Sequence, residues 1–75
     1  MGMEQEHLAQ SIRHIARAEE MVCKQRDLIA RLAGDGHDTG MAENLLATML
    51  TTLDRMRDHR RLIEAAIAAG GPGTS

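Results

Sequence analysis

The sequence predicts an all-α protein, an antiparallel helical hairpin that pairs with a second copy into a four-helix bundle. The chain of 75 residues contains no Phe, Trp or Tyr, and its 43% of hydrophobic residues are mainly Ala, Leu, Met and Ile. This composition favours helices and lacks the aromatic and β-branched residues of sheets. Residues 4–33 and 41–69 contain neither Gly nor Pro, and a short turn-forming stretch separates them. Two uninterrupted arms joined by a short loop are typical of a hairpin of two helices.

The first arm, residues 4–33, is expected to form one helix. Apolar residues recur in it at every seventh position, with a companion row three positions further along. The rows are Leu8, Ile15, Val22 and Ile29, and then Ser11, Ala18, Gln25 and Leu32. This is the a and d spacing of helices that cross at a shallow angle, as in coiled coils and bundles.

Residues 34–39 are expected to form the turn. This stretch contains two Gly and two Asp, a composition typical of loops. Gly34 is expected to adopt the left-handed conformation just past the first helix, because Gly has no Cβ to oppose it. Asp38 or Thr39 is expected to cap the second helix through a side-chain oxygen.

The second arm, residues 40–69, repeats the seven-residue pattern. Its rows are Leu46, Leu53, Arg60 and Ile67, and then Ala42, Met49, Met56 and Ile63. Residues 1–69 are therefore expected to form one helical hairpin. The Gly-rich stretch 70–75 is expected to be a flexible tail.

Polar side chains interrupt the apolar rows at Ser11, Gln25 and Arg60. Such residues lower stability but can fix the register of paired helices and their oligomeric state. On the helix surfaces, opposite charges four residues apart are expected to pair. These pairs are Glu20–Lys24, Asp27–Arg31 and Arg60–Glu64.

The apolar stripe is wider than the seam between two helices requires. The flanking residues are Ile12, Met21 and Leu28 in the first arm and Leu45, Leu50 and Leu62 in the second. A lone hairpin would leave much of this surface in water, and chains this short are only marginally stable. We therefore expect a homodimer. Its expected interface residues are Leu8, Ile12, Ile15, Val22, Ile29, Leu46, Met49, Leu53, Met56, Ile63 and Ile67.

Few residues could carry chemistry. Folding the arms together brings His7, His14 and His59 to one end of the hairpin, where three imidazoles could bind zinc or nickel. No pair of them has the four-residue spacing of a helical metal clamp, so we expect no metal and no cofactor. Cys23 is alone, with no His placed to act as its base. We therefore expect no catalytic residue and no enzyme activity.

The charge balance bears on partners and location. The net charge is −2, which is too balanced to predict binding to nucleic acid or to an anionic membrane. No apolar run approaches the roughly 20 residues that a membrane-spanning helix needs, and no signal peptide is evident. A single cysteine fits a reducing compartment. We therefore expect a cytoplasmic protein.

Several short stretches resemble a group of small bacterial proteins that carry a Gly-His-Asp-Thr turn between two helices. The turn is residues 36–39, and the accompanying motifs are Ala-Glu-Asn-Leu-Leu at 42–46 and Met-Arg-Asp-His-Arg at 56–60. The resemblance extends over residues 7–64. It implies a helical hairpin and no particular activity. It also raises the expectation that the His37 ring packs over the turn.

The function expected from these features is that of a small, non-enzymatic helical interaction or adaptor protein, which self-associates through its apolar stripe. The alternative is an obligate subunit, or a chaperone-like protein, whose stripe binds a helix of another protein. Methionine in the stripe suits the alternative, because its flexible side chain adapts to several partners. Metal binding through histidine is the least favoured of the three possibilities.

Overall fold

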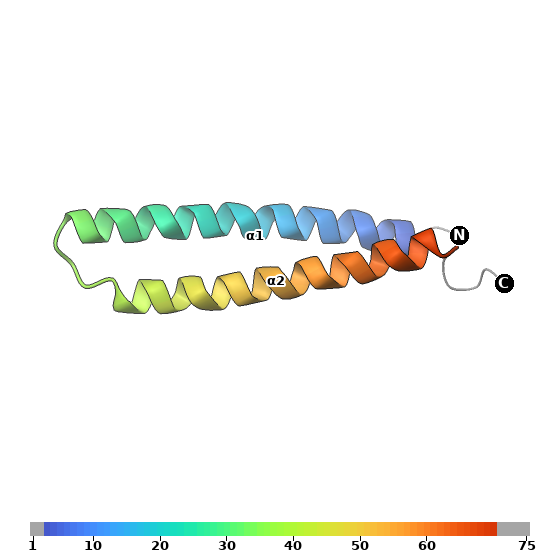
Figure 1. Cartoon of the computed structure of the whole chain (residues 1–75). Coiled ribbons are helices and arrows are strands. Elements are labelled where there is room, and N and C mark those ends of the chain that lie inside the picture. The colour runs from blue at the N-terminus through green and yellow to red at the C-terminus, as the bar shows by residue number, and fades with distance from the viewer. Residues whose placement is uncertain (1–2, 71–75) are drawn as a thin grey trace.

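A computed structural model describes residues 3–70 of the chain. Helix α1 spans Met3–Gly34 and helix α2 spans Gly40–Ala68, and the described residues contain no strand. The helices lie antiparallel and in contact along their length (Figure 1), which confirms the all-α hairpin. Helix α1 extends one residue beyond each expected end, and α2 ends one residue early. Of the expected flexible tail, residues 71–75 lie outside the described residues.

Burial follows the seven-residue period through both helices. All sixteen residues of the four rows are buried or half-buried, whereas most residues between the rows are exposed. The fully buried core consists of Ile15, Val22 and Leu53. A seven-residue repeat averages 3.5 residues per turn, against 3.6 in a straight α-helix. A repeat of this length keeps the contact stripe between the two helices from end to end.

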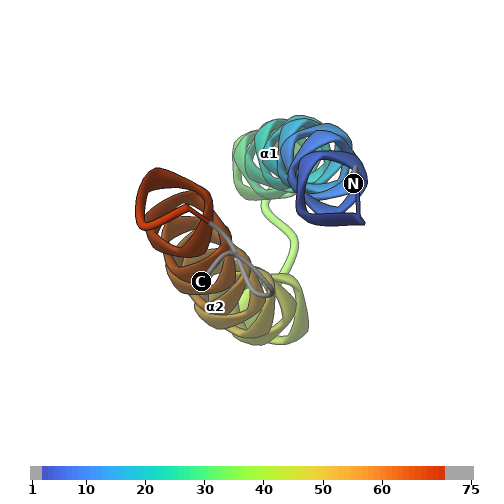
Figure 2. The ribbon, with the colours of Figure 1, turned by 90° about the vertical axis from the view of Figure 1, so that its right-hand side faces the viewer.

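The hairpin is long and thin. Its extents are 60 × 15 × 13 Å, and Figure 2, which looks along the long axis, shows α1 and α2 side by side. The radius of gyration is 17.2 Å, against about 11 Å for a compact chain of this length. The accessible surface is 5693 Å², against about 4500 Å² for a compact monomer of this mass. Two helices alone therefore leave an unusually large surface in contact with solvent.

The turn after α1 is a Schellman motif. The His37 N–H donates to the Leu32 carbonyl at 2.9 Å, and the Gly36 N–H donates to the Ala33 carbonyl at 3.1 Å. Gly36 has a φ of +79°, whereas Gly34 is the last residue of α1. The expectation of a left-handed Gly34 is therefore wrong. Beyond Gly34, the Asp35 N–H still donates to the Arg31 carbonyl at 3.0 Å, and the chain reverses at the second glycine, Gly36.

Helix α2 begins with a turn made by Asp38. Its Oδ1 accepts a hydrogen bond from the Gly40 N–H at 2.9 Å. Thr39 occupies the N-cap position but makes no capping hydrogen bond, and its hydroxyl donates to the Glu43 carboxylate instead. The His37 side chain is exposed, and the expectation that its ring packs over the turn stays a prediction. Its backbone N–H closes the turn.

One polar interruption of the rows, Gln25, makes a contact across the seam. The half-buried Gln25 donates from Nε2 to the Ala42 carbonyl of the other helix at 2.9 Å. This hydrogen bond gives the polar side chain a partner and fixes the position of one helix along the other.

Of the three expected ion pairs, Arg60–Glu64 forms, with a distance of 3.3 Å. The described residues contain no ion pair between Glu20 and Lys24 or between Asp27 and Arg31, so those two expectations are wrong.

The small core makes stability depend on single side chains. We expect Leu53→Ala to lower the free energy of unfolding by about 2–5 kcal/mol, because Leu53 is 3% exposed and its loss leaves a cavity. Leu62→Ala is the matched control, since Leu62 is 70% exposed. Urea unfolding followed by far-UV circular dichroism measures both. Equal losses of stability in the two variants would contradict the position of the core.

The two glycines of the turn provide a second test. We expect Gly36→Ala to cost about 1–2 kcal/mol, because an L side chain is strained at positive φ. Gly34→Ala should stabilise the protein by up to about 1 kcal/mol, since Gly34 is helical and an added Cβ meets no atom within 4 Å. Thermal unfolding of the two variants should shift in opposite directions. Shifts of the same sign would contradict the Schellman turn.

Candidate functional site

The groove between α1 and α2 opens on both long sides of the hairpin, and the two sides differ. On one side, His7, His14, Met21 and Leu28 follow each other along α1 at seven-residue intervals. Across the groove from them, His59 and Leu45 project from α2. Because residues seven apart stay on one side of a coiled coil, these side chains form one continuous surface.

We name this surface the carboxylate-free face. It is made by the row just described and by the row next to it, further from the seam, on each helix. From α1 it takes His7, Gln10, His14, Arg17, Met21, Lys24, Leu28 and Arg31. From α2 it takes Met41, Leu45, Thr48, Thr52, Arg55, His59, Leu62 and Ala66.

Apolar side chains gather on this face, most of them toward the turn. There a shallow groove of about 430 Å³ is lined by Met21, Leu28, Leu45 and the half-buried Met49. The described residues include six exposed large hydrophobic side chains, and five of them belong to this face: Met21, Leu28, Met41, Leu45 and Leu62. The sixth, Ile12, lies on the other side of the hairpin. The exposed apolar surface is therefore concentrated on one side.

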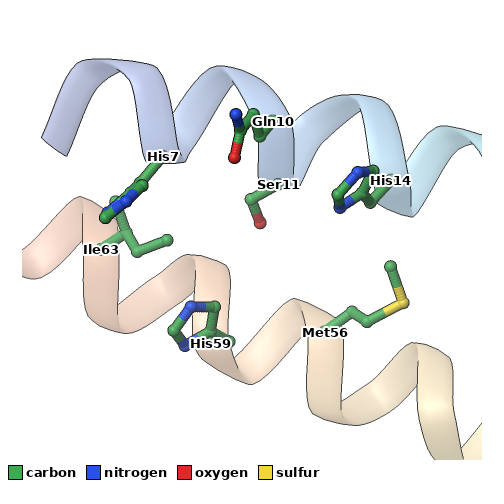
Figure 3. Close-up of a pocket in the computed structure, with 7 residues that line it drawn as sticks. All are labelled: His7, Gln10, Ser11, His14, Met56, His59 and Ile63. Atoms are coloured by element: carbon green, nitrogen blue, oxygen red, sulfur yellow. The ribbon is translucent and has the colours of Figure 1, made fainter. Parts of the chain in front are cut away.

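Toward the open end of the hairpin the same face carries three histidines. Figure 3 shows His7 and His14 reaching from α1 and His59 from α2 into a shallow hollow, which Met56 and Ile63 line at its base. The three rings are spread along the hollow and do not converge on one point. Among the described residues no group of three His, Cys, Asp or Glu side chains is placed to hold a metal ion. The hollow lies on the same side of the hairpin as the groove and has more polar residues in its lining.

The charges of the molecule are segregated. The chain has eleven Asp and Glu residues, and none of them belongs to the carboxylate-free face. That face carries four cations at Arg17, Lys24, Arg31 and Arg55, and none of the four has an ion-pair partner within residues 3–70. The face thus carries three of its four cations along its α1 edge, whereas its exposed apolar side chains lie mostly toward the turn.

The opposite side of the hairpin carries ion pairs, one of which joins the two helices. Arg57 Nη2 lies 2.8 Å from Glu19 Oε2 of the other helix, and its Nη1 lies 3.9 Å from Asp54. Cys23 is a free thiol on the rim of this side, away from the three histidines, and it is exposed. Cys23 therefore has none of these three histidines beside it to act as a base.

The residues expected to form a dimer interface fall into two groups. Ten of the eleven lie between the two helices of one chain: Leu8, Ile15, Val22, Ile29, Leu46, Met49, Leu53, Met56, Ile63 and Ile67. Ile12 is exposed, but on the side opposite the apolar groove. The surface that remains open is built from the flanking residues. Each of them stands one position before a residue of a row in the sequence, but this position alone does not show which flanks of the two helices meet.

Comparison with known proteins adds no relative. No family model, curated protein or solved structure matches the chain. The resemblance to small bacterial hairpin proteins therefore stays a prediction. Neither described helix is apolar enough over a sufficient length to cross a membrane.

The ion pair between the helices should contribute little to stability. We expect Glu19→Gln to lower the free energy of unfolding by about 0.2–1 kcal/mol, because both partners are more than 40% exposed. The loss should disappear at high salt, which screens the pair. Glu20→Gln is the matched control, since Glu20 has no partner among the described residues. Urea titrations at low and high salt measure both, and equal effects would contradict the pair.

Proposed function

We propose that this protein is a non-enzymatic helical interaction protein that docks further helices on its carboxylate-free face. The observation that supports the proposal is the placement of five of the six exposed large hydrophobic side chains on that one face. Scattered exposed apolar residues are normal on a protein surface, but a continuous patch marks an interaction site. The docked helices belong to a second copy of the chain or to another helical protein.

The thinness of the hairpin supports the same proposal. Its core of three fully buried residues is small, and a helix gains most of its stability from packing its apolar side. A face about 60 Å long and 15 Å wide offers up to about 900 Å². This area matches the roughly 800 Å² that each partner contributes to a stable protein interface. Docked helices would complete a four-helix or three-helix bundle.

The side chains in the groove suit docking better than catalysis. Met21 and Met49 line it with flexible thioether side chains, which adapt to the shape of a partner. The groove is shallow and open along its length, whereas small-molecule sites enclose most of their ligand. We place the protein in the cytoplasm, because its single cysteine is a free, exposed thiol.

A binding measurement tests the proposal. The probe is a synthetic amphipathic helix of about three heptads, with Leu at its a and d positions and uncharged Gln beside them. Its affinity for the full chain is measured by fluorescence anisotropy. We expect Leu45→Gln to weaken binding by about tenfold or more, because it places a polar group in the apolar groove.

The control is Ile12→Gln, on the opposite side, where the side chain is 44% exposed against 52% for Leu45. It should leave the affinity unchanged. The mass of the chain is measured in parallel by light scattering with refractive-index detection, since the chain lacks Trp and Tyr. A dimer that Leu45→Gln dissociates also supports docking on this face. A monomer that binds no helix would contradict the proposal.

A further inference from the structure

The charges of the carboxylate-free face distinguish between its two candidate occupants, provided that the proposed docking function holds. Arg17, Lys24 and Arg31 follow each other along α1 at seven-residue intervals, about 10.5 Å apart at the rise of a helix. Lys24 and Arg31 stand directly on the rim of the apolar groove. The groove therefore has a mostly apolar floor, interrupted by Gln25, and a cationic edge along α1.

Its edge along α2 has a different character. There the corresponding row is Met41, Thr48, Arg55 and Leu62, with a single cation. The two rims are thus unlike each other, so a helix lying in the groove would have one preferred orientation about its own axis. Its apolar stripe would face the groove, and the charges on one of its flanks would meet the α1 row.

A second copy of the chain is a poor electrostatic match for this face. In a two-fold pairing, both partners use the same face. The cations of one copy would then meet cations, histidines or apolar side chains of the other, because the face contains no carboxylate. Like charges brought together across an interface select against a partner. By contrast, Glu or Asp on the flank of a foreign helix would pair with Lys24 and Arg31.

An extended anionic surface, such as a lipid bilayer, is also a poor match. The hairpin is only 13–15 Å thick, and its carboxylates are spread over its remaining sides and the turn. The Debye length at physiological salt is about 8 Å, so carboxylates at the edges of the face also act on a broad surface. A single helix seated in the groove contacts chiefly the cations on its rim.

We propose that the carboxylate-free face binds an acidic amphipathic helix of another protein. The partner helix carries an apolar stripe that fills the groove lined by Met21, Leu28 and Leu45. It also carries Asp or Glu at seven-residue intervals on the flank that faces Lys24 and Arg31. The apolar contacts supply affinity, and the charges select the partner and its orientation.

The test uses three synthetic helices with the same apolar positions. Their flanking positions carry Glu, Gln or Lys, and their affinities for the full chain are measured by fluorescence anisotropy at low and high salt. At low salt we expect the Glu-flanked helix to bind about tenfold or more tighter than the Lys-flanked helix. The preference should shrink as salt screens the charges on the rim.

Charge-reversal variants locate the effect. Lys24→Glu with Arg31→Glu should abolish or reverse the preference for the Glu-flanked helix. The matched control is Arg13→Glu with Arg26→Glu, which changes the net charge equally on α1 but outside the face. Neither Arg13 nor Arg26 has an ion pair among the described residues. The control should keep the preference, and circular dichroism verifies that both variants fold.

The outcomes separate this inference from the docking function. Binding without a preference for Glu, or an equal effect of the two double variants, overturns the inference and leaves docking intact. So does a stable homodimer that Leu45→Gln dissociates, because a second copy then occupies the face. Binding to phosphatidylserine vesicles without binding to the Glu-flanked helix also overturns it. Failure of all three helices to bind a monomeric chain overturns both proposals.

Discussion

The structure depends on one seam of side chains between two antiparallel helices. Residues at a and d positions are the only ones that every turn of both helices places in contact, and they carry nearly all the burial. The seam sets the rotation of each helix about its own axis. All other surface properties follow from that rotation, because it decides which residues point toward either side of the hairpin.

The same rotation sorts charge and apolarity into separate surfaces. Residues on one flank of the seam include Met21, Leu28 and Leu45, whereas those on the other include Glu19 and Arg57, which pair across the groove. One side carries an ion pair between the helices. The other side remains open, apolar and free of carboxylates. This asymmetry is the physical basis for assigning a docking role to one side only.

Local chemistry explains the details of the turn, including those that differ from expectation. Gly34 and Gly36 are both suited to ending a helix, and the sequence does not rank them. The choice is made by the backbone, because the Schellman hydrogen bonds from Gly36 and His37 reach Ala33 and Leu32 only if the chain reverses at Gly36. Likewise, Asp38 bonds the Gly40 N–H, while Thr39 turns to Glu43.

The candidate site was harder to predict than the fold. The interface predicted from the apolar rows consists mostly of residues such as Val22 and Leu53, which the hairpin uses for its own core. The three histidines do approach one hollow, as the folding of the arms suggested, but their rings are spread along it. Which residues form the core and how close the histidine rings lie depend on the direction of the side chains in both helices. The spacing of residues along one helix does not give that direction.

By itself, the sequence determined the two helices, the position of the turn and the rows that form the seam. These are local or periodic properties, set by helix propensity, glycine placement and the seven-residue repeat. Only the tertiary structure decided that Leu28 and Leu45, distant in sequence, line one groove, and that no carboxylate lies beside them. The physical reason is that antiparallel packing brings one flank of each helix together. Which flanks meet depends on the rotation of each helix about its own axis, and the packing of the two helices sets that rotation.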